Sequence, residues 1–320
     1  MDLGRMLEKC HAGQWHADDL DWSAPPPRLP RAREEAVVQA FTDMAGIERL
    51  AAALFEAQAR KATDPTLRAI FASFVVDEAR HAVVAARLAR YYDVHRYRAY
   101  RLAPALVAFR APFLAVIEQA PPEIANAYVT AGELLLDVAL LRSLDDYVGD
   151  PMSHQAMALI NRDEARHIAI DFHMTEVYSS DAYLAARAAR PGPTRRAQLA
   201  AAAAVARMLW HAQAFLKDVF LTPIDLTDPS GRRLREALKR IQLVGRKPQV
   251  ARLPFMRVML TLQDLYLHPL AGPLLAGVLL RLLGAEPRLA QRLYTDAELA
   301  QVATQSFDQL AADALGERAP

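Results

Sequence analysis

Apolar residues recur every three or four positions along most of the chain, which is the pattern of amphipathic helices. Residues 1–31 depart from it as an arm in which Trp15 and Trp22 stand among polar residues and prolines follow from Pro25 to Pro30. Proline cannot continue a helix, so we expect the helical part to begin after the arm. The long helices predicted there cover residues 33–62, 65–92, 103–119, 122–148 and 151–178.

Two of these helices begin with the same capping signal. Asp64-Pro65 and Asp150-Pro151 each place a capping aspartate before a proline in the first helical turn. Gly149 is the expected end signal of the preceding helix. The matched starts predict two equivalent helical hairpins.

The remaining residues also follow a helical pattern. Thr295 and Glu298 form a capping box for the last predicted helix. The predicted helices here cover residues 181–190, 194–221, 229–243, 253–267, 270–283 and 295–314, with breaks at Pro191-Gly192-Pro193, Pro223, Gly245 and Pro287. We divide the chain into the arm (1–31), a four-helix unit (32–180) and a helical extension packing on it (181–320).

Composition supports an all-α fold and narrows the classes of partner. The chain has 320 residues, 53% of them hydrophobic, with only 12 glycines. A net charge of +1, from 38 basic and 37 acidic residues, gives no reason to expect a nucleic-acid partner.

Cellular location is read from the cysteine count and from apolar runs. The single cysteine, Cys10, excludes an internal disulfide and a thiolate-bound iron–sulfur cluster of the chain's own. With no apolar core at the amino terminus, this indicates a cytoplasmic protein. We find no window of about 20 apolar residues and expect no transmembrane span. The nearest stretch, 269–283, is expected to be a packed helix.

A repeated pentapeptide carries the chemistry. Asp-Glu-Ala-Arg-His occurs at 77–81 and again at 163–167. A glutamate and a histidine three residues apart share one helix face, so Glu78 with His81, and Glu164 with His167, can each reach one metal ion.

Two further glutamates complete a dinuclear set. Glu48 precedes Glu78 by 30 residues and Glu133 precedes Glu164 by 31, the offsets that bring residues level across two antiparallel hairpins. The helix around Glu133 is apolar on every side, which indicates burial, and a buried carboxylate needs compensation. A metal explains this better than a structural salt-bridge network. The six predicted ligands are Glu48, Glu78, His81, Glu133, Glu164 and His167.

The order E, ExxH, E, ExxH resembles the ferritin-like diiron carboxylate superfamily. The resemblance implies a ferritin-like four-helix bundle, here with additional C-terminal helices. The Asp-Glu-x-Arg-His form is most similar to the oxygen-activating branch, the bacterial multicomponent monooxygenases in particular. Carboxylates with imidazoles suit two iron ions with O2 as co-substrate, and manganese in one position is an alternative.

The same resemblance assigns roles to the other residues of the pentapeptides. Asp77 would accept the outer N–H of His167, and Asp163 that of His81, with Arg80 and Arg166 extending the network. The alternative is that both aspartates are solvated surface acids.

Three residues near the ligands are weaker candidates. Asp137 and Asp171 each continue a ligand face by one turn and could deliver protons, although an ordinary core hydrogen bond or a water-facing position explains them more simply. Thr130, one turn before Glu133, could bond to bound oxygen, or could simply pack.

Departures from known branches narrow the function. Ala85 stands where ribonucleotide reductase small subunits carry a radical tyrosine, which argues against that role. Ile160 stands where the p-aminobenzoate N-oxygenases carry a third histidine, which puts arylamine N-oxygenation in doubt.

We therefore expect an O2-dependent diiron oxygenase that hydroxylates or N-oxygenates a small organic substrate. Its electrons would come from a ferredoxin or a flavin reductase, because the chain carries no nucleotide-binding motif. A homodimer is possible. The alternatives are a ferroxidase or ferritin-like iron-handling protein, a heterodinuclear Mn/Fe oxidase, and a structural helical protein with a relic site.

Overall fold

The computed structural model describes residues 1–97, 99–190, 192, 194–270, 272 and 287–315. The part of the chain that it describes is mainly helical and contains no strand. The prediction of an all-α fold is therefore confirmed. The predicted helix over 270–283 lies outside the described residues except at 270 and 272.

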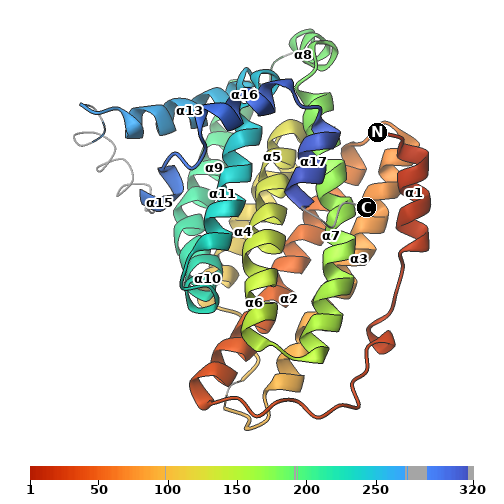
Figure 1. Cartoon of the computed structure of the whole chain (residues 1–320). Coiled ribbons are helices and arrows are strands. Elements are labelled where there is room, and N and C mark those ends of the chain that lie inside the picture. The colour runs from red at the N-terminus through yellow and green to blue at the C-terminus, as the bar shows by residue number, and fades with distance from the viewer. Residues whose placement is uncertain (98, 191, 193, 271, 273–286, 316–320) are drawn as a thin grey trace.

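Four long helical segments form the bundle (Figure 1). They are α2 (Arg31–Lys61), α3 (Pro65–Tyr92), the segment α5 (Pro122–Glu133) with η2 (Leu134–Leu141) and α6 (Arg142–Val148), and α7 (Pro151–Tyr178). The segments α2 and α3 pack as one hairpin, and the α5 segment and α7 as the other.

The predicted start signals are confirmed. The carboxylate of Asp64 accepts a hydrogen bond from the backbone N–H of Leu67, and that of Asp150 accepts one from Ser153, both at 2.8 Å. Gly149 ends α6 at φ +67°, a conformation that favours glycine. These turns fix where each hairpin reverses, and so which residues of its two helices lie level.

The helix α4 (Pro104–Gln119) carries the chain between the two hairpins along the outside of the bundle. It packs on α2. At its far end, the Lys61 ammonium donates to the carbonyls of Ile117 and Ala120. The chain thereby returns to the end of the bundle where α5 begins (Figure 1).

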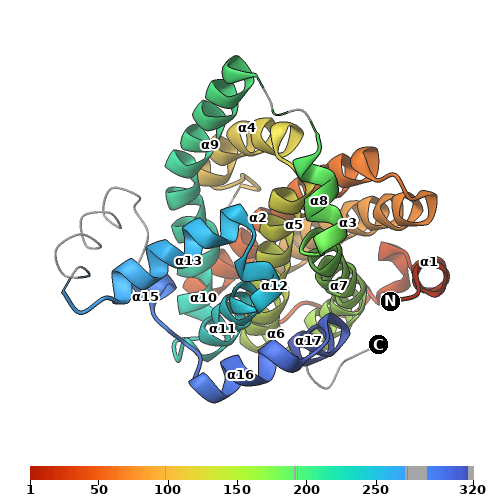
Figure 2. The same ribbon diagram turned by 90° about the horizontal axis from the view of Figure 1, so that it is seen from above.

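The later helices cover one side and one end of the bundle. The helix α11 (Arg232–Arg246) packs on η2, α17 (Phe307–Leu315) packs on α7, and α9 (Arg195–Phe215) packs on α4. The helix α13 (Pro254–Leu267) runs across the others (Figures 1 and 2). The remaining elements are α1 (Leu3–Ala12), the 3₁₀ turn η1 (Ala17–Asp19), α8 (Asp181–Ala188), η3 (Leu216–Leu221), α10 (Thr222–Thr227), α12 (Pro248–Ala251), α15 (Pro287–Ala290) and α16 (Asp296–Thr304).

Several predicted boundaries were wrong. The arm begins with a helix, α1, which packs on α3. Pro223 does not end the helix after 194, because it directly follows the π-helical turn η3, where backbone pairing is already shifted. Gly245 lies inside α11. The last predicted helix is two helices, α16 and α17, although the capping box of Thr295 and Glu298 is present.

Within the described residues, two helices are long and apolar enough to cross a membrane, which corrects the expectation that no such segment exists. The first, Pro122–Val148, is 67% buried and is the bundle helix that carries Glu133. The second, Arg195–Thr227, is only 6% buried and exposes Leu199 and Trp210. Length and composition alone are weak evidence of a membrane span. The first helix is explained by the bundle core.

Candidate metal centre

The six predicted ligands meet in the middle of the bundle. The helix α2 supplies Glu48, α3 supplies Glu78 and His81, the last residue of α5 is Glu133, and α7 supplies Glu164 and His167. Each of these side chains is buried, Glu133 at 3% exposure and the others at 0%. The offsets of 30 and 31 residues therefore bring Glu48 level with Glu78, and Glu133 level with Glu164, as the sequence analysis predicted.

The ligand atoms form two overlapping groups. One joins Glu48 and His81 with Glu78 and Glu164, and the other joins Glu133 and His167 with the same two glutamates. Within each group the atoms lie within 4.8 Å of one another. Glu78 and Glu164 belong to both groups, so they are placed to bridge two neighbouring ions.

The unsatisfied atoms of the cluster fit two such ions. Seven buried atoms of these residues make no hydrogen bond to any described residue: both carboxylate oxygens of Glu48 and Glu78, one each of Glu133 and Glu164, and Nδ1 of His81. Buried polar atoms are almost always satisfied in proteins, so a concentration of this kind calls for a bound group. Carboxylate oxygens and imidazoles suit iron or manganese.

Both imidazole rings turn the same nitrogen toward the glutamates. Nδ1 of His81 lies 3.1 Å from Glu164, and Nδ1 of His167 lies 3.1 Å from Glu78. The opposite nitrogens face aspartates: Nε2 of His81 lies 3.1 Å from Asp163 and Nε2 of His167 lies 3.4 Å from Asp77. An N–H held by a carboxylate at Nε2 leaves Nδ1 free to bind a metal.

Burial and crowding of like charges separate the pKa values of the glutamates. Burial, and then the negative charge of a neighbouring glutamate, raise the pKa of Glu48 and of Glu133 well above 4.5. Burial would also raise the pKa of Glu164, but the charge of His167 and the hydrogen bond from its ring lower it well below 4.5. The metal-free cluster therefore holds protons that two bound cations would displace.

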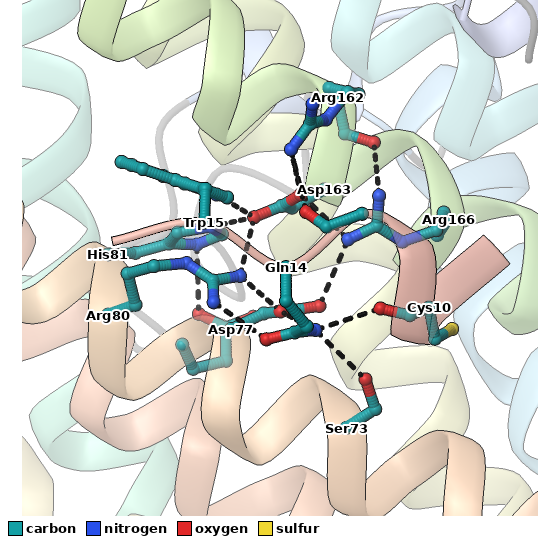
Figure 3. Close-up of polar contacts among 12 residues, drawn as sticks. Cys10, Gln14, Trp15, Ser73, Asp77, Arg80, His81, Arg162, Asp163 and Arg166 are labelled. Carbon is teal, nitrogen blue, oxygen red and sulfur yellow. Dashed lines mark hydrogen bonds and ion pairs between the residues drawn. The ribbon is translucent and has the colours of Figure 1, made fainter. Parts of the chain in front are cut away.

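The two aspartates and two arginines of the pentapeptides form one crossed network (Figure 3). Arg80 bonds to Asp77 and, at 2.9 Å, to Asp163. Arg166 bonds to Asp163 at 2.7 Å and to Asp77 at 3.2 Å. Both aspartates are fully buried, so the structure does not place them as solvated surface acids.

The N-terminal arm completes this network, which the sequence analysis missed. The Trp15 indole N–H donates to Asp163 at 2.7 Å, and the Gln14 amide donates to Asp77 at 3.0 Å. Gly13 lies so close to Arg166 that a Cβ there would come within 2.7 Å of its guanidinium. The sequence signal for it was the pair of tryptophans among polar residues in the arm.

The two histidines differ in their aromatic neighbours. The ring of His81 has Trp15 at 6.5 Å between centroids, whereas His167 has Phe74 at 4.1 Å and Phe55 at 5.2 Å. The tryptophan also lies under the guanidinium of Arg80, at 5.0 Å. The arm therefore contacts the His81 side through the Trp15 ring, and the His167 side through the hydrogen bond from Gln14 to Asp77.

A π-helical segment begins directly after Glu133. In η2 the i→i+5 pairing widens the helix, and such turns are common at functional sites. Asp137 consequently meets Arg142, five residues later, at 2.8 Å. Burial raises the pKa of Asp137 despite this cation.

Asp171 and Thr130 lie on either side of Asn126, a residue that the sequence analysis did not select. Asp171 is fully buried, and neither of its two carboxylate oxygens makes a hydrogen bond to a described residue. Burial raises the pKa of this carboxyl group well above 3.8. The Thr130 hydroxyl donates to the carbonyl of Asn126 at 2.8 Å. Asn126 in turn donates to the carbonyl of Asp171 at 3.0 Å.

A cavity of about 760 Å³ opens beside α5. Thr130 and Leu134 line it and flank Glu133 in sequence, so its wall comes within about one helical turn of the metal cluster. The opposite wall is formed by α11, α12 and α13, helices of the C-terminal extension. Their sequence carried no signal for a cavity, because its lining is ordinary apolar helix.

A comparison with protein families places the chain. No curated protein matches the chain. The family model of P-aminobenzoate N-oxygenase AurF matches residues 47–222, which include all six predicted ligands. The pentapeptide alone had suggested the multicomponent monooxygenases. Ile160, where the sequence analysis expects a histidine in the p-aminobenzoate N-oxygenases, is packed in the core. With more than half of its length matched, the chain belongs to the AurF family of diiron oxygenases within the ferritin-like superfamily.

Proposed function

We propose that the protein is a non-haem diiron oxygenase that uses O2 to hydroxylate or N-oxygenate a small organic substrate. The observation that carries the proposal is the pair of overlapping ligand groups, with seven buried atoms that lack hydrogen-bond partners among the described residues. Glu48 and His81 would hold one ion, Glu133 and His167 the other, and Glu78 and Glu164 both. Two iron ions bound there supply the electrons that activate O2.

The chain's own residues prepare this chemistry in three ways. Asp77 and Asp163 hold the histidine rings, and the two arginines balance the charge of those aspartates. The apolar helix around Glu133 excludes water from one side of the centre. Thr130, Asp137 and Asp171 stand nearest to that side as candidates for positioning oxygen or a proton.

The cavity beside α5 supports an organic substrate over iron handling, because iron alone needs no apolar chamber of this size. The name of the family supports N-oxygenation, which the absence of a histidine at position 160 had put in doubt.

We further propose that manganese can replace one iron. A ferredoxin or flavin reductase in the cytoplasm would supply the electrons. The exposed face of α9 would form the interface of a homodimer.

Anaerobic Fe(II) loading followed by O2 exposure tests the proposal. We expect two iron ions per chain in the wild type, about one in Glu48→Ala, and near none in Glu164→Ala, because Glu164 belongs to both groups. Glu56→Ala, an exposed position on the same helix as Glu48, is the control and should bind two. Equal iron content in all four proteins would refute the site. Iron oxidation that yields a mineral core and no organic turnover would favour the ferroxidase.

A further inference from the structure

The cavity beside α5 differs from the rest of the centre in its chemistry. Its lining is overwhelmingly apolar and includes Leu134, Ile241, Val250, Phe255 and Met256. Binding an ion or a polar metabolite there would leave its charge or its polar groups unpaired. The lining therefore favours an apolar ligand.

Size separates this cavity from one made for a single ring. A cavity of roughly 150 Å³ holds benzene, and this one is about 760 Å³. A one-ring substrate would leave most of the apolar wall without contact, which forfeits the burial that drives apolar binding. The volume calls for a molecule several times larger.

The charged residues of the lining do not offer a site for a carboxylate. Among the described residues, the lining contains one acid, Glu123, and one arginine, Arg187, and these two form an ion pair. Tyr183 also donates to Glu123, at 2.6 Å. A carboxylate on the substrate would compete for Arg187 and leave Glu123, which is 6% exposed, without its cation.

The side-chain oxygen of Asn126 is a polar atom of the lining that no described residue satisfies. The Asn126 amide donates to the carbonyl of Asp171 and to the Thr175 hydroxyl, and because a carbonyl only accepts, the NH₂ group must lie on that side. Its oxygen is then an acceptor, buried and without a partner among the described residues. A substrate N–H or O–H would satisfy it.

We propose that the cavity takes an uncharged, mainly apolar substrate larger than one aromatic ring, which presents an N–H or O–H group to Asn126 and carries no carboxylate. The proposal names a substrate class for the proposed oxygenase, and the ligand of the cavity is a substrate only if that oxygenase function is correct. The selectivity itself is a property of the cavity, so it can be measured without metal.

Calorimetric titration of the metal-free protein with aniline, 4-butylaniline, 4-hexylaniline and p-aminobenzoate tests the proposal. Burial of each added methylene should raise affinity roughly fourfold, so 4-hexylaniline should bind at least about 100-fold more tightly than aniline. We expect p-aminobenzoate to bind no better than aniline. Affinity that does not rise with chain length, or tightest binding by p-aminobenzoate, would overturn the proposal.

A pair of matched substitutions locates the binding. Ala127→Trp, on the cavity wall, should weaken 4-hexylaniline at least tenfold by filling the space. Ala111→Trp, on the exposed side of α4, should leave it unchanged. Equal affinity in both variants would place the binding elsewhere and overturn the proposal. If the binding pattern holds but the iron-loaded protein consumes no O2, the oxygenase function fails and the cavity's selectivity stands.

Discussion

The metal cluster has a polar side and an apolar side, and buried acids behave in opposite ways on the two. On the arm side, burial would raise the pKa of Asp163, but the hydrogen bond from His81 and the charges of His81 and Arg166 lower it below 3.8. On the α5 side, burial raises the pKa of Asp171 well above 3.8, and no cation bonds to it among the described residues. The same residue type is held ionised on one side and driven toward its neutral form on the other.

This difference assigns separate tasks to the two sides. The arm side is a closed set of charge-assisted hydrogen bonds that holds the histidines in place. The α5 side leaves polar atoms unsatisfied next to a cavity, which is costly for stability and useful for binding. Substitutions on the arm side should therefore affect stability and metal affinity, and those on the cavity side should affect ligand binding.

The largest expected effect comes from Arg166→Met. It leaves Asp77 and Asp163 buried with one arginine between them, and removal of one partner from a buried ion pair typically costs about 3–5 kcal/mol. Urea unfolding of the metal-free protein measures the loss. Arg162→Met, which removes a half-exposed guanidinium from the same helix, is the control and should cost less than about 1 kcal/mol. A similar loss in both variants would argue against the closed network.

Trp15→Phe tests whether the arm belongs to the polar side. The phenylalanine keeps the apolar contact but loses the hydrogen bond to Asp163, so we expect a stability loss of about 1.5–3 kcal/mol. Thermal unfolding checks this value. Trp22→Phe, whose indole donates to a backbone carbonyl of the arm and to no acid of the network, should cost less. The comparison weakens if Trp22→Phe proves the more damaging change.

Asp163→Asn tests whether the hydrogen bond between Asp163 and His81 contributes to metal affinity. The amide no longer holds the His81 N–H as a charged acceptor, so we expect metal affinity to fall roughly 10–100-fold. Competition with a chelator measures it, and Thr130→Val on the cavity side should leave affinity unchanged.

The pH dependence of the same variant has a definite sign. Because folding lowers the pKa of Asp163, its carboxylate stabilises the fold fully above pH 3.8, and this contribution is lost as the pH falls further. The stability gap between wild type and Asp163→Asn should therefore close in acid. A gap that is constant with pH would show that the charge of Asp163 does not matter.

The smallest expected effect is that of Asp171→Asn, which should raise stability rather than lower it. Folding raises the pKa of Asp171, so an ionised Asp171 destabilises the metal-free fold at neutral pH and this cost disappears as the pH falls to 3.8. Asp171→Asn should raise stability by about 1 kcal/mol at neutral pH and by nothing in acid. Denaturant unfolding at the two pH values measures both. A destabilised variant at neutral pH would remove the contrast between the sides.

The sequence by itself determined the two hairpins and the candidate ligands that they bring together. The ExxH spacing, the paired aspartate–proline starts and the nearly equal offsets of Glu48 and Glu133 are local or periodic features, and helix geometry converts them directly into shared faces and level positions. The crossed pairing of Asp77 with His167 and of Asp163 with His81 was suggested by the resemblance, and the structure makes both contacts.

Only the tertiary structure decided what surrounds that core. Trp15 meets Asp163 across 148 residues, and the cavity joins α5 to helices more than 100 residues further along the chain. No spacing rule links such positions, because their proximity depends on how separate helices pack and on how the chain returns between them. Periodicity fixes which face of a helix is buried, whereas the partner that covers this face is a property of the whole fold.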